Sequence, residues 1–352
     1  MWLLDKLKRE NTLTLEEYEC LSSVKALELI YYAAEHAGEV RKEVYGNEVY
    51  IRGLIKISNR CGNDCFYCGI RRSNKNCERY FLPREQILAC CAKGYVLGLR
   101  TFVLQGGGGT ITADTICDII SDIHRIYPDC AIMLSLGEHI RSEYEQMYFA
   151  GANHYSLYHM TADREHYERL HPGEMSFHNR MDCLRDLKDI GFRIGCGFMV
   201  GSPHQTPHTL AKELKFIEEF QPDMCGITPF VPHKDTPFSS FHPGTLLQTV
   251  YLLSLARLIR PNILLPSATV LSCIAEDGRE RSIKAGANVV TVDLSPMSVR
   301  DKYSPHDNKT DRGEAKHELE QLKVSMERIG YRVAFDRGNV KRQSDLPKKE
   351  RP

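Results

Sequence analysis

The chain has 352 residues, which is longer than most single domains but within the range of one α/β barrel with additions. Its 46 basic and 46 acidic side chains balance, so no net charge is available to attract nucleic acid or an anionic membrane. The first residues lack the apolar core of a signal peptide, and no apolar run is long enough to cross a bilayer. We therefore expect a cytoplasmic protein in a reducing compartment that acts on small molecules or proteins.

Short apolar runs and amphipathic stretches alternate along most of the chain. Thr14 and Glu17 form a capping-box pattern, so residues 1–45 are predicted to be helical. Apolar residues at helical spacing recur between later strand-like runs, and a last helix is predicted to end at Gly330. Eight strand-like runs are present, and they cover residues 49–57, 101–105, 131–136, 154–158, 193–200, 224–231, 263–269 and 288–294.

This alternation predicts an α/β fold. Strands that alternate with helices form parallel sheets, and eight repeats predict a (β/α)8 barrel over residues 46–300. A doubly wound open sheet is the alternative. Residues 1–45 would form an N-terminal helical cap, and residues 301–340 would form a C-terminal helix and closing segment. Residues 341–352 lose the periodicity and are predicted to be a disordered tail.

The strongest local signal is a cysteine motif, Cys61-x-x-x-Cys65-x-x-Cys68, directly after the first predicted strand. Three thiolates this close can hold three irons of a cubane iron–sulfur cluster, whereas a complete 4Fe-4S site takes four cysteines. One iron would stay open to a small chelating molecule. A zinc site is the competing interpretation, but zinc motifs pair two Cys-x-x-Cys halves, and no second half follows.

Small and polar residues follow the second and third predicted strands, and barrel chemistry collects at this end of the strands. Gly106 and Gly107 begin a glycine run whose backbone could approach a ligand closely, with a flexible turn as the alternative. Ser135 lies at the end of the third strand and Glu138 follows it, where a carboxylate could hold a ribose hydroxyl or an ammonium group.

Three further candidates follow the last two predicted strands. Thr269, Arg300 and Tyr303 supply a hydroxyl, a guanidinium and a phenol that could bind an anionic or amino-acid-like substrate. A surface salt bridge is an equally good account of Arg300.

The cysteine motif, with Tyr67 before its last cysteine, resembles that of radical S-adenosylmethionine (SAM) enzymes. A longer set of segments resembles one group among them, the HydE family of FeFe-hydrogenase maturases, which is related to biotin synthase and methylornithine synthase. The matching segments include residues 57–61, 67–72, 134–138, 170–172, 229–233, 278–280 and 285–290.

The resemblance implies a radical SAM barrel with one 4Fe-4S cluster bound by Cys61, Cys65 and Cys68. SAM would chelate the open iron, and an electron from the cluster would cleave SAM to methionine and a 5′-deoxyadenosyl radical. A ferredoxin or flavodoxin would supply the electron. The substrate would be a small molecule or an iron–cysteine complex, and other hydrogenase maturases would be partners.

The resemblance also assigns roles to the remaining candidates. It places the substrate end of the barrel at Thr269, Arg300 and Tyr303. It places the SAM-binding residues at Tyr67, Gly106, Gly107, Ser135, Glu138 and Tyr158.

The chain departs from the maturase pattern at several positions. Tyr158-His159-Met160-Thr161 stands where the maturases have Arg-His-Glu-Thr, and Tyr158 is similar to methylornithine synthase. Ala268 replaces the first of two family threonines, and no Cys follows Cys273, so a second cluster is not expected. A maturase-like enzyme acting on a thiol or amino-acid-derived substrate and an amino-acid mutase therefore both remain open. A non-catalytic iron–sulfur or zinc scaffold is the third alternative.

Overall fold

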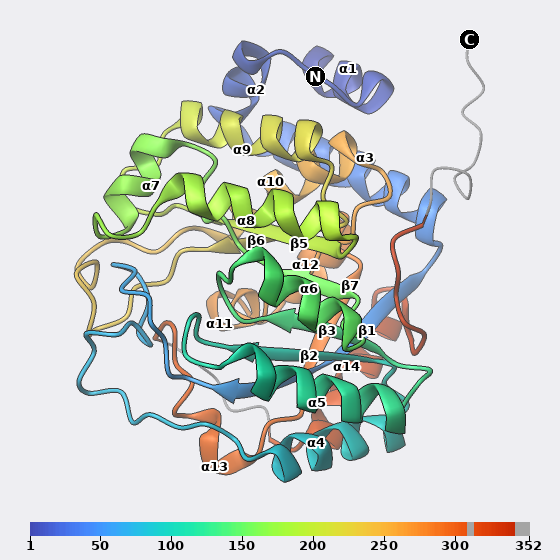
Figure 1. Cartoon of the computed structure of the whole chain (residues 1–352). Coiled ribbons are helices and arrows are strands. Elements are labelled where there is room, and N and C mark those ends of the chain that lie inside the picture. Colours follow the sequence, from blue (N-terminus) through green and yellow to red (C-terminus); the bar gives the residue numbers. More distant parts are fainter. Residues whose placement is uncertain (308–312, 342–352) are drawn as a thin grey trace.

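The structure is a computed structural model that describes residues 1–307 and 313–341 (Figure 1). Of the predicted disordered tail, residues 341–352, the structure describes Lys341 alone, and residues 342–352 lie outside the described residues. Within the described ranges, no helix combines the length and the apolar character that a membrane crossing requires.

Helices and strands alternate as the sequence predicts. The strands are β1 (Glu48–Ser58), β2 (Thr101–Gly106), β3 (Ala131–Ser135), β4 (His154–Ser156), β5 (Arg193–Val200), β6 (Met224–Pro229), β7 (Val289–Asp293) and β8 (Arg332–Ala334). The helices are α1 (Trp2–Glu10), α2 (Leu15–Ser22), α3 (Leu27–Tyr45), α4 (Arg84–Val96), α5 (Ala113–Ile126), α6 (Arg141–Phe149), α7 (Arg164–Leu170), α8 (Phe177–Ile190), α9 (Pro207–Phe220), α10 (Leu246–Ile259), α11 (Leu271–Ile274), α12 (Gly278–Lys284), α13 (Met297–Arg300) and α14 (Ala315–Arg328).

The strands form one parallel sheet in the order β6-β5-β4-β3-β2-β1-β7, and the short β8 also pairs with β1. Isolated bridges join the two ends of this sheet, because Leu264 pairs with Met224 of β6 and Pro266 pairs with Val289 of β7. The ring is thus completed, and the predicted α/β barrel is confirmed rather than the doubly wound alternative.

One predicted strand is wrong in detail. Residues 263–269 form bridges instead of a continuous strand, because Pro266 has no N–H to give to a ladder. The stretch still bonds on both sides: Leu264 N donates to Asp223 O at 2.9 Å, and Ser267 N donates to Val289 O at 2.8 Å.

Alternation along β1 separates the core from the barrel interior. Ile55 and Ile57 are fully buried in the main hydrophobic core, whereas Arg52, Leu54 and Lys56 line an internal cavity. This period of two is the pleat of a strand, and it decides which side chains a ligand inside the barrel can meet.

The N-terminal helices pack on the outer helix layer (Figure 1). Helix α2 packs against α9 and α3 against α10, and the capping box of Thr14 and Glu17 is present at the start of α2. Tyr18 donates a 2.6 Å hydrogen bond to Glu218 of α9. Among the described residues, none before Arg52 lines the cavity, so these helices cover the barrel's flank and not its opening. The domain boundaries at residues 45, 300 and 340 stay predictions.

Candidate active site

A cavity of about 530 Å³ occupies the barrel interior and opens toward the carboxyl ends of the strands. Its lining includes most residues that the sequence singled out, namely Cys61, Tyr67, Cys68, Gly106, Gly107, Ser135, Tyr158, Thr269, Arg300 and Tyr303. Cys65 and Glu138 do not line it. Cys65 packs beside Tyr67, and Glu138 bonds a residue of the lining. The parallel strands thus gather residues from distant parts of the chain at one opening.

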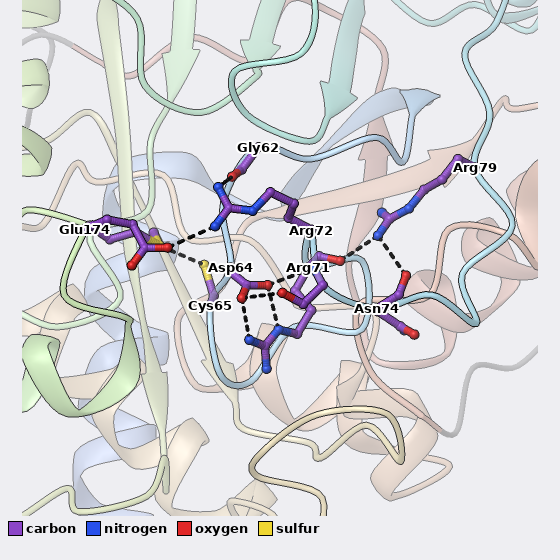
Figure 2. A network of polar contacts seen from close by, with 10 residues as sticks. Gly62, Asp64, Cys65, Arg71, Arg72, Asn74, Arg79 and Glu174 are labelled. Atoms are coloured by element: carbon purple, nitrogen blue, oxygen red, sulfur yellow. Dashed lines mark hydrogen bonds and ion pairs between the residues drawn. The ribbon is translucent and has the colours of Figure 1, made fainter.

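Polar side chains fix the cysteine loop, residues 59–79, by bonding its backbone carbonyls and its one buried carboxylate, that of Asp64 (Figure 2). Arg71 donates to both oxygens of Asp64, at 2.8 and 2.6 Å, and Ser73 donates to the same carboxylate. The Arg71 guanidinium keeps the pKa of Asp64 well below its usual range. Arg79 adds donors to backbone carbonyls, those of Asn59, Ile70, Arg71 and Asn74. The loop is therefore a fixed support for its thiols.

The three motif thiols lie in surroundings that disfavour a bare thiolate. Burial raises the pKa of Cys65 to about 11 and also raises the pKa of Cys61 and of Cys68. A bound cation compensates this cost, so the donors suit a metal centre. In the part of the chain that the structure describes, no three His, Cys, Asp or Glu side chains converge on a single ion. The spacing of the three cysteines in the sequence matches that of a cubane cluster, in which each thiolate binds a separate iron.

Tyr67, the aromatic residue of the motif, belongs to a buried hydrogen-bonded chain. His171 Nδ1 lies 2.9 Å from the Tyr167 carbonyl, which can only accept, so we assign the ring proton to Nδ1. The Tyr67 hydroxyl then donates to His171 Nε2 at 3.0 Å. Burial lowers the pKa of His171 to about 3, which keeps the ring neutral and able to accept. No sequence pattern indicated this hydrogen-bonding role of His171.

The glycine loop, residues 106–109, packs directly against the cysteine loop. A Cβ at Gly107 would lie 2.0 Å from the Arg60 carbonyl oxygen and 2.6 Å from Cys61 Cβ. Gly62 N donates to Gly108 O at 2.7 Å, so the two loops are also bonded. Contact between backbones thus requires glycine at position 107, whether or not a ligand also approaches there.

Glu138 is paired, which the sequence did not predict. Its carboxylate lies 2.8 Å from Arg180 Nη2 and accepts from Asn63 Nδ2 at 3.0 Å. Arg180 is buried and lines the cavity; burial disfavours its charge, but Glu138 outweighs this and raises the pKa of Arg180. The available signal was a charged residue on the buried face of α8, beside Met181 and Leu184.

Tyr158 crosses the barrel interior. Its ring lies against Gly197 of β5 and Gly226 of β6, which are register partners, and a Cβ at Gly226 would lie 1.7 Å from the Tyr158 hydroxyl oxygen. The next inward residue, Met160, has φ of +66°, a left-handed conformation that is uncommon for a side-chain-bearing residue. Tyr158 and Met160, at which the sequence departs from the pattern that it otherwise resembles, thus both line the cavity.

The predicted substrate-end residues have different surroundings. Arg300 donates to the backbone carbonyls of Ser295 and Asp293, at 3.0 and 2.6 Å, and to that of Gly313, so three of its N–H groups serve the backbone. Tyr303 is buried beside Lys56, whereas Thr269 is exposed at the cavity edge. The sequence missed Lys56 and its partner Asp293, which form an ion pair on the cavity wall.

Comparison with known proteins identifies relatives of this chain. The Radical SAM superfamily model matches residues 55–217. The [FeFe] hydrogenase maturase subunit HydE of Thermotoga maritima is 39% identical over 274 residues, which cover 78% of each chain. The 3-methylornithine synthase of Methanosarcina acetivorans is 28% identical over 316 residues, 89% of this chain and 87% of that protein.

A solved structure shares the fold. The crystal structure of methylornithine synthase (PylB) superposes with a TM-score of 0.81 and 24% identity, over 97% of this chain and 98% of that one. The protein therefore belongs to the radical SAM superfamily, whose enzymes use a 4Fe-4S cluster and SAM to act on small substrates with an electron donor.

Proposed function

We propose that this enzyme is a HydE-like maturase that acts on a thiol or amino-acid-derived substrate, such as an iron–cysteine complex, during assembly of the FeFe-hydrogenase metal centre. The observation that carries the proposal is the 39% identity to HydE over 78% of both chains. A ferredoxin or flavodoxin would supply electrons, other hydrogenase maturases would be partners, and the site of action would be the cytoplasm.

In this proposal Cys61, Cys65 and Cys68 hold the cluster, which supplies the electron that cleaves SAM when both are bound. The bonded loop of Asp64 and Arg71 keeps the three thiols in register. Contacts to SAM would come from Tyr67, Gly106, Gly107, Ser135, Glu138 and Tyr158.

The remaining residues shape the space around the reaction. Arg180 and Glu138 neutralise one another at the cavity edge, so a polar cofactor meets donors and acceptors there without an unpaired buried charge. Apolar side chains such as Val103, Met133 and Met199 line the wall and exclude water from a reactive intermediate. Thr269, Arg300 and Tyr303 would bound the substrate end.

Hydrogenase maturation in a defined mixture tests the proposal. The protein, reconstituted anaerobically with iron and sulfide, should replace HydE in a maturation reaction that contains the other maturases and apo-hydrogenase. Hydrogen evolution is the readout, and 5′-deoxyadenosine is measured in parallel. SAM cleavage without any hydrogenase activation would contradict the maturase assignment and leave the radical SAM chemistry intact.

An amino-acid mutase is the second candidate. It is supported by similarity to 3-methylornithine synthase over 89% of the chain and by Tyr158, at a position where the maturases have arginine. The reconstituted enzyme, incubated with SAM, reductant and lysine, the straight-chain isomer of 3-methylornithine, would then yield a rearranged product of unchanged mass. Chromatography that separates isomers decides between the two functions.

A further inference from the structure

An ion pair stands on the inner wall of the barrel. Lys56 of β1 and Asp293 of β7 both line the cavity, and Lys56 Nζ lies 2.7 Å from Asp293 Oδ2. The two side chains remain 12% and 16% exposed. Since both residues belong to the cavity lining, a ligand inside the barrel can reach both charges.

The backbone at the strand ends fixes the pair. Ser295 N donates to Asp293 Oδ1 at 2.9 Å, and Ser295 Oγ accepts from Lys56 N at 2.8 Å. The ammonium lies 5.6 Å from the centroid of the Tyr303 ring, within cation–π range. Burial alone would raise the pKa of Asp293, but the Lys56 ammonium outweighs it, so the pKa is lowered and the carboxylate is ionised.

Each charge keeps bonding capacity that the described residues do not use. Lys56 Nζ has three N–H groups and donates to Asp293 alone among the described residues. Within residues 1–307 and 313–341, Asp293 Oδ2 accepts from Lys56 alone and could accept again. Arg300, which the sequence favoured as an anion ligand, instead spends three donors on backbone carbonyls.

We propose that Lys56 and Asp293 recognise a zwitterionic head group of the substrate, with its carboxylate on Lys56 and its ammonium on Asp293. This proposal rests on the proposed function, because it takes the cavity to be the substrate site. A zwitterion adds equal and opposite charges, so the net charge of the buried site stays zero. A ligand with one charge leaves an unpaired charge in a medium of low polarity, which is costly. The pair therefore selects for an α-amino-acid head.

A matched set of probes tests the charge requirement. L-norvaline carries both charges, butylamine carries only the ammonium, and pentanoate carries only the carboxylate on similar apolar chains. Binding is measured calorimetrically on the reconstituted holoenzyme with SAM bound. We expect L-norvaline to bind at least about tenfold more tightly than either relative, since each charged hydrogen bond is worth that much. Equal affinities for the three probes would overturn the proposal.

Variants separate recognition from a structural role. Lys56→Met and Asp293→Asn should each weaken L-norvaline binding at least about tenfold. Because a single change leaves one buried charge and can impair folding, the double variant Lys56→Met/Asp293→Leu replaces the pair with apolar groups. This variant should keep a cooperative thermal transition but lose the preference for L-norvaline over pentanoate and butylamine.

Asp277→Asn, which changes an exposed ion pair with Arg281, is the matched control and should keep the preference. A double variant that still prefers L-norvaline contradicts the proposal. So does one that loses affinity for SAM in parallel, because the pair would then bind the cofactor. Since the readout is binding, failure to activate hydrogenase does not affect this test.

Discussion

The cysteine loop and the interior wall of the barrel are built in different ways. The loop draws its frame from its own sequence, because Asp64, Arg71 and Arg79 bond one another or nearby carbonyls within residues 59–79. The wall combines residues of several strands and of the segments that follow them, as with Lys56 and Asp293 or Tyr158 and Gly226. The loop that carries the motif cysteines is therefore encoded locally, while the interior wall depends on the assembled barrel.

The largest effect is expected when one of the motif thiols is removed from the cysteine loop. Cys65→Ala should abolish both the cluster and 5′-deoxyadenosine formation, because a methyl group cannot bind iron. Iron and sulfide content and product chromatography after anaerobic reconstitution measure this. Cys117→Ala, a half-buried cysteine of α5 outside the motif, is the control and should keep both. Turnover in the Cys65 variant at the level of this control would refute the ligand assignment.

Breaking the ion pair of Asp64 and Arg71 in the cysteine loop should lower the free energy of unfolding. Asp64→Ala leaves Arg71 with an uncompensated buried charge, and breaking such pairs costs about 3–5 kcal/mol. Urea denaturation of the holoenzyme measures the free energy of unfolding. Asp277→Ala removes an exposed partner of Arg281, and such pairs contribute about 1 kcal/mol or less. Equal losses of stability in the two variants would show that the ion pair of Asp64 and Arg71 stabilises the protein no more than an exposed ion pair does.

Acid should remove the stabilisation that the ion pair of Asp64 and Arg71 provides. The folded pKa of Asp64 lies below its unfolded value of about 4, so its contribution is complete above that pH and is lost as pH falls through the folded pKa. The wild type should therefore lose more stability than Asp64→Ala when the pH falls below about 4. Parallel pH profiles would contradict this linkage.

A larger side chain at a glycine of the interior wall should destabilise the barrel. Gly226→Ala puts a Cβ 1.7 Å from the Tyr158 hydroxyl oxygen, so the ring must move, and such overpacking costs about 1–3 kcal/mol. Tyr158→Ala should rescue it, so the double variant should lie closer to Tyr158→Ala than additivity allows. Additive costs in this cycle would place the strain elsewhere.

The smallest effect is expected from loss of the hydrogen bond between Tyr67 and His171. Tyr67→Phe removes the hydroxyl that donates to His171 Nε2 and should cost about 0.5–1.5 kcal/mol. His171→Phe should cost more, since it leaves the Tyr67 hydroxyl and the Tyr167 carbonyl without this partner. The free energy of unfolding by urea measures both. The reverse order would contradict the role of His171 as the partner of both Tyr67 and Tyr167.

The sequence predicted best what depends on short spacing. The cysteine motif, the capping box of Thr14 and Glu17, and Gly330, with φ of +82° after α14, all follow from neighbouring residues. Seven of the eight predicted strands also appear, because a buried strand leaves an apolar run.

What the sequence did not predict depends on long-range contacts. Arg180 and Glu138 are far apart in the chain, and only the fold shows that their charges meet. Lys56 and Asp293 occupy ordinary inward positions of two strands that become neighbours when the barrel closes. Residues 263–269 look like a strand by composition, yet Pro266 limits them to bridges.

The position of the N-terminal helices has a practical consequence for anchoring the enzyme to a surface. Helix α1 sits on the outer layer (Figure 1). No described residue before Arg52 lines the cavity. A linker attached ahead of Trp2, which is 68% exposed, would tether the protein by its flank. An electrode or bead carrying such tethers would leave the barrel opening free for electrons and reactants to arrive from solution.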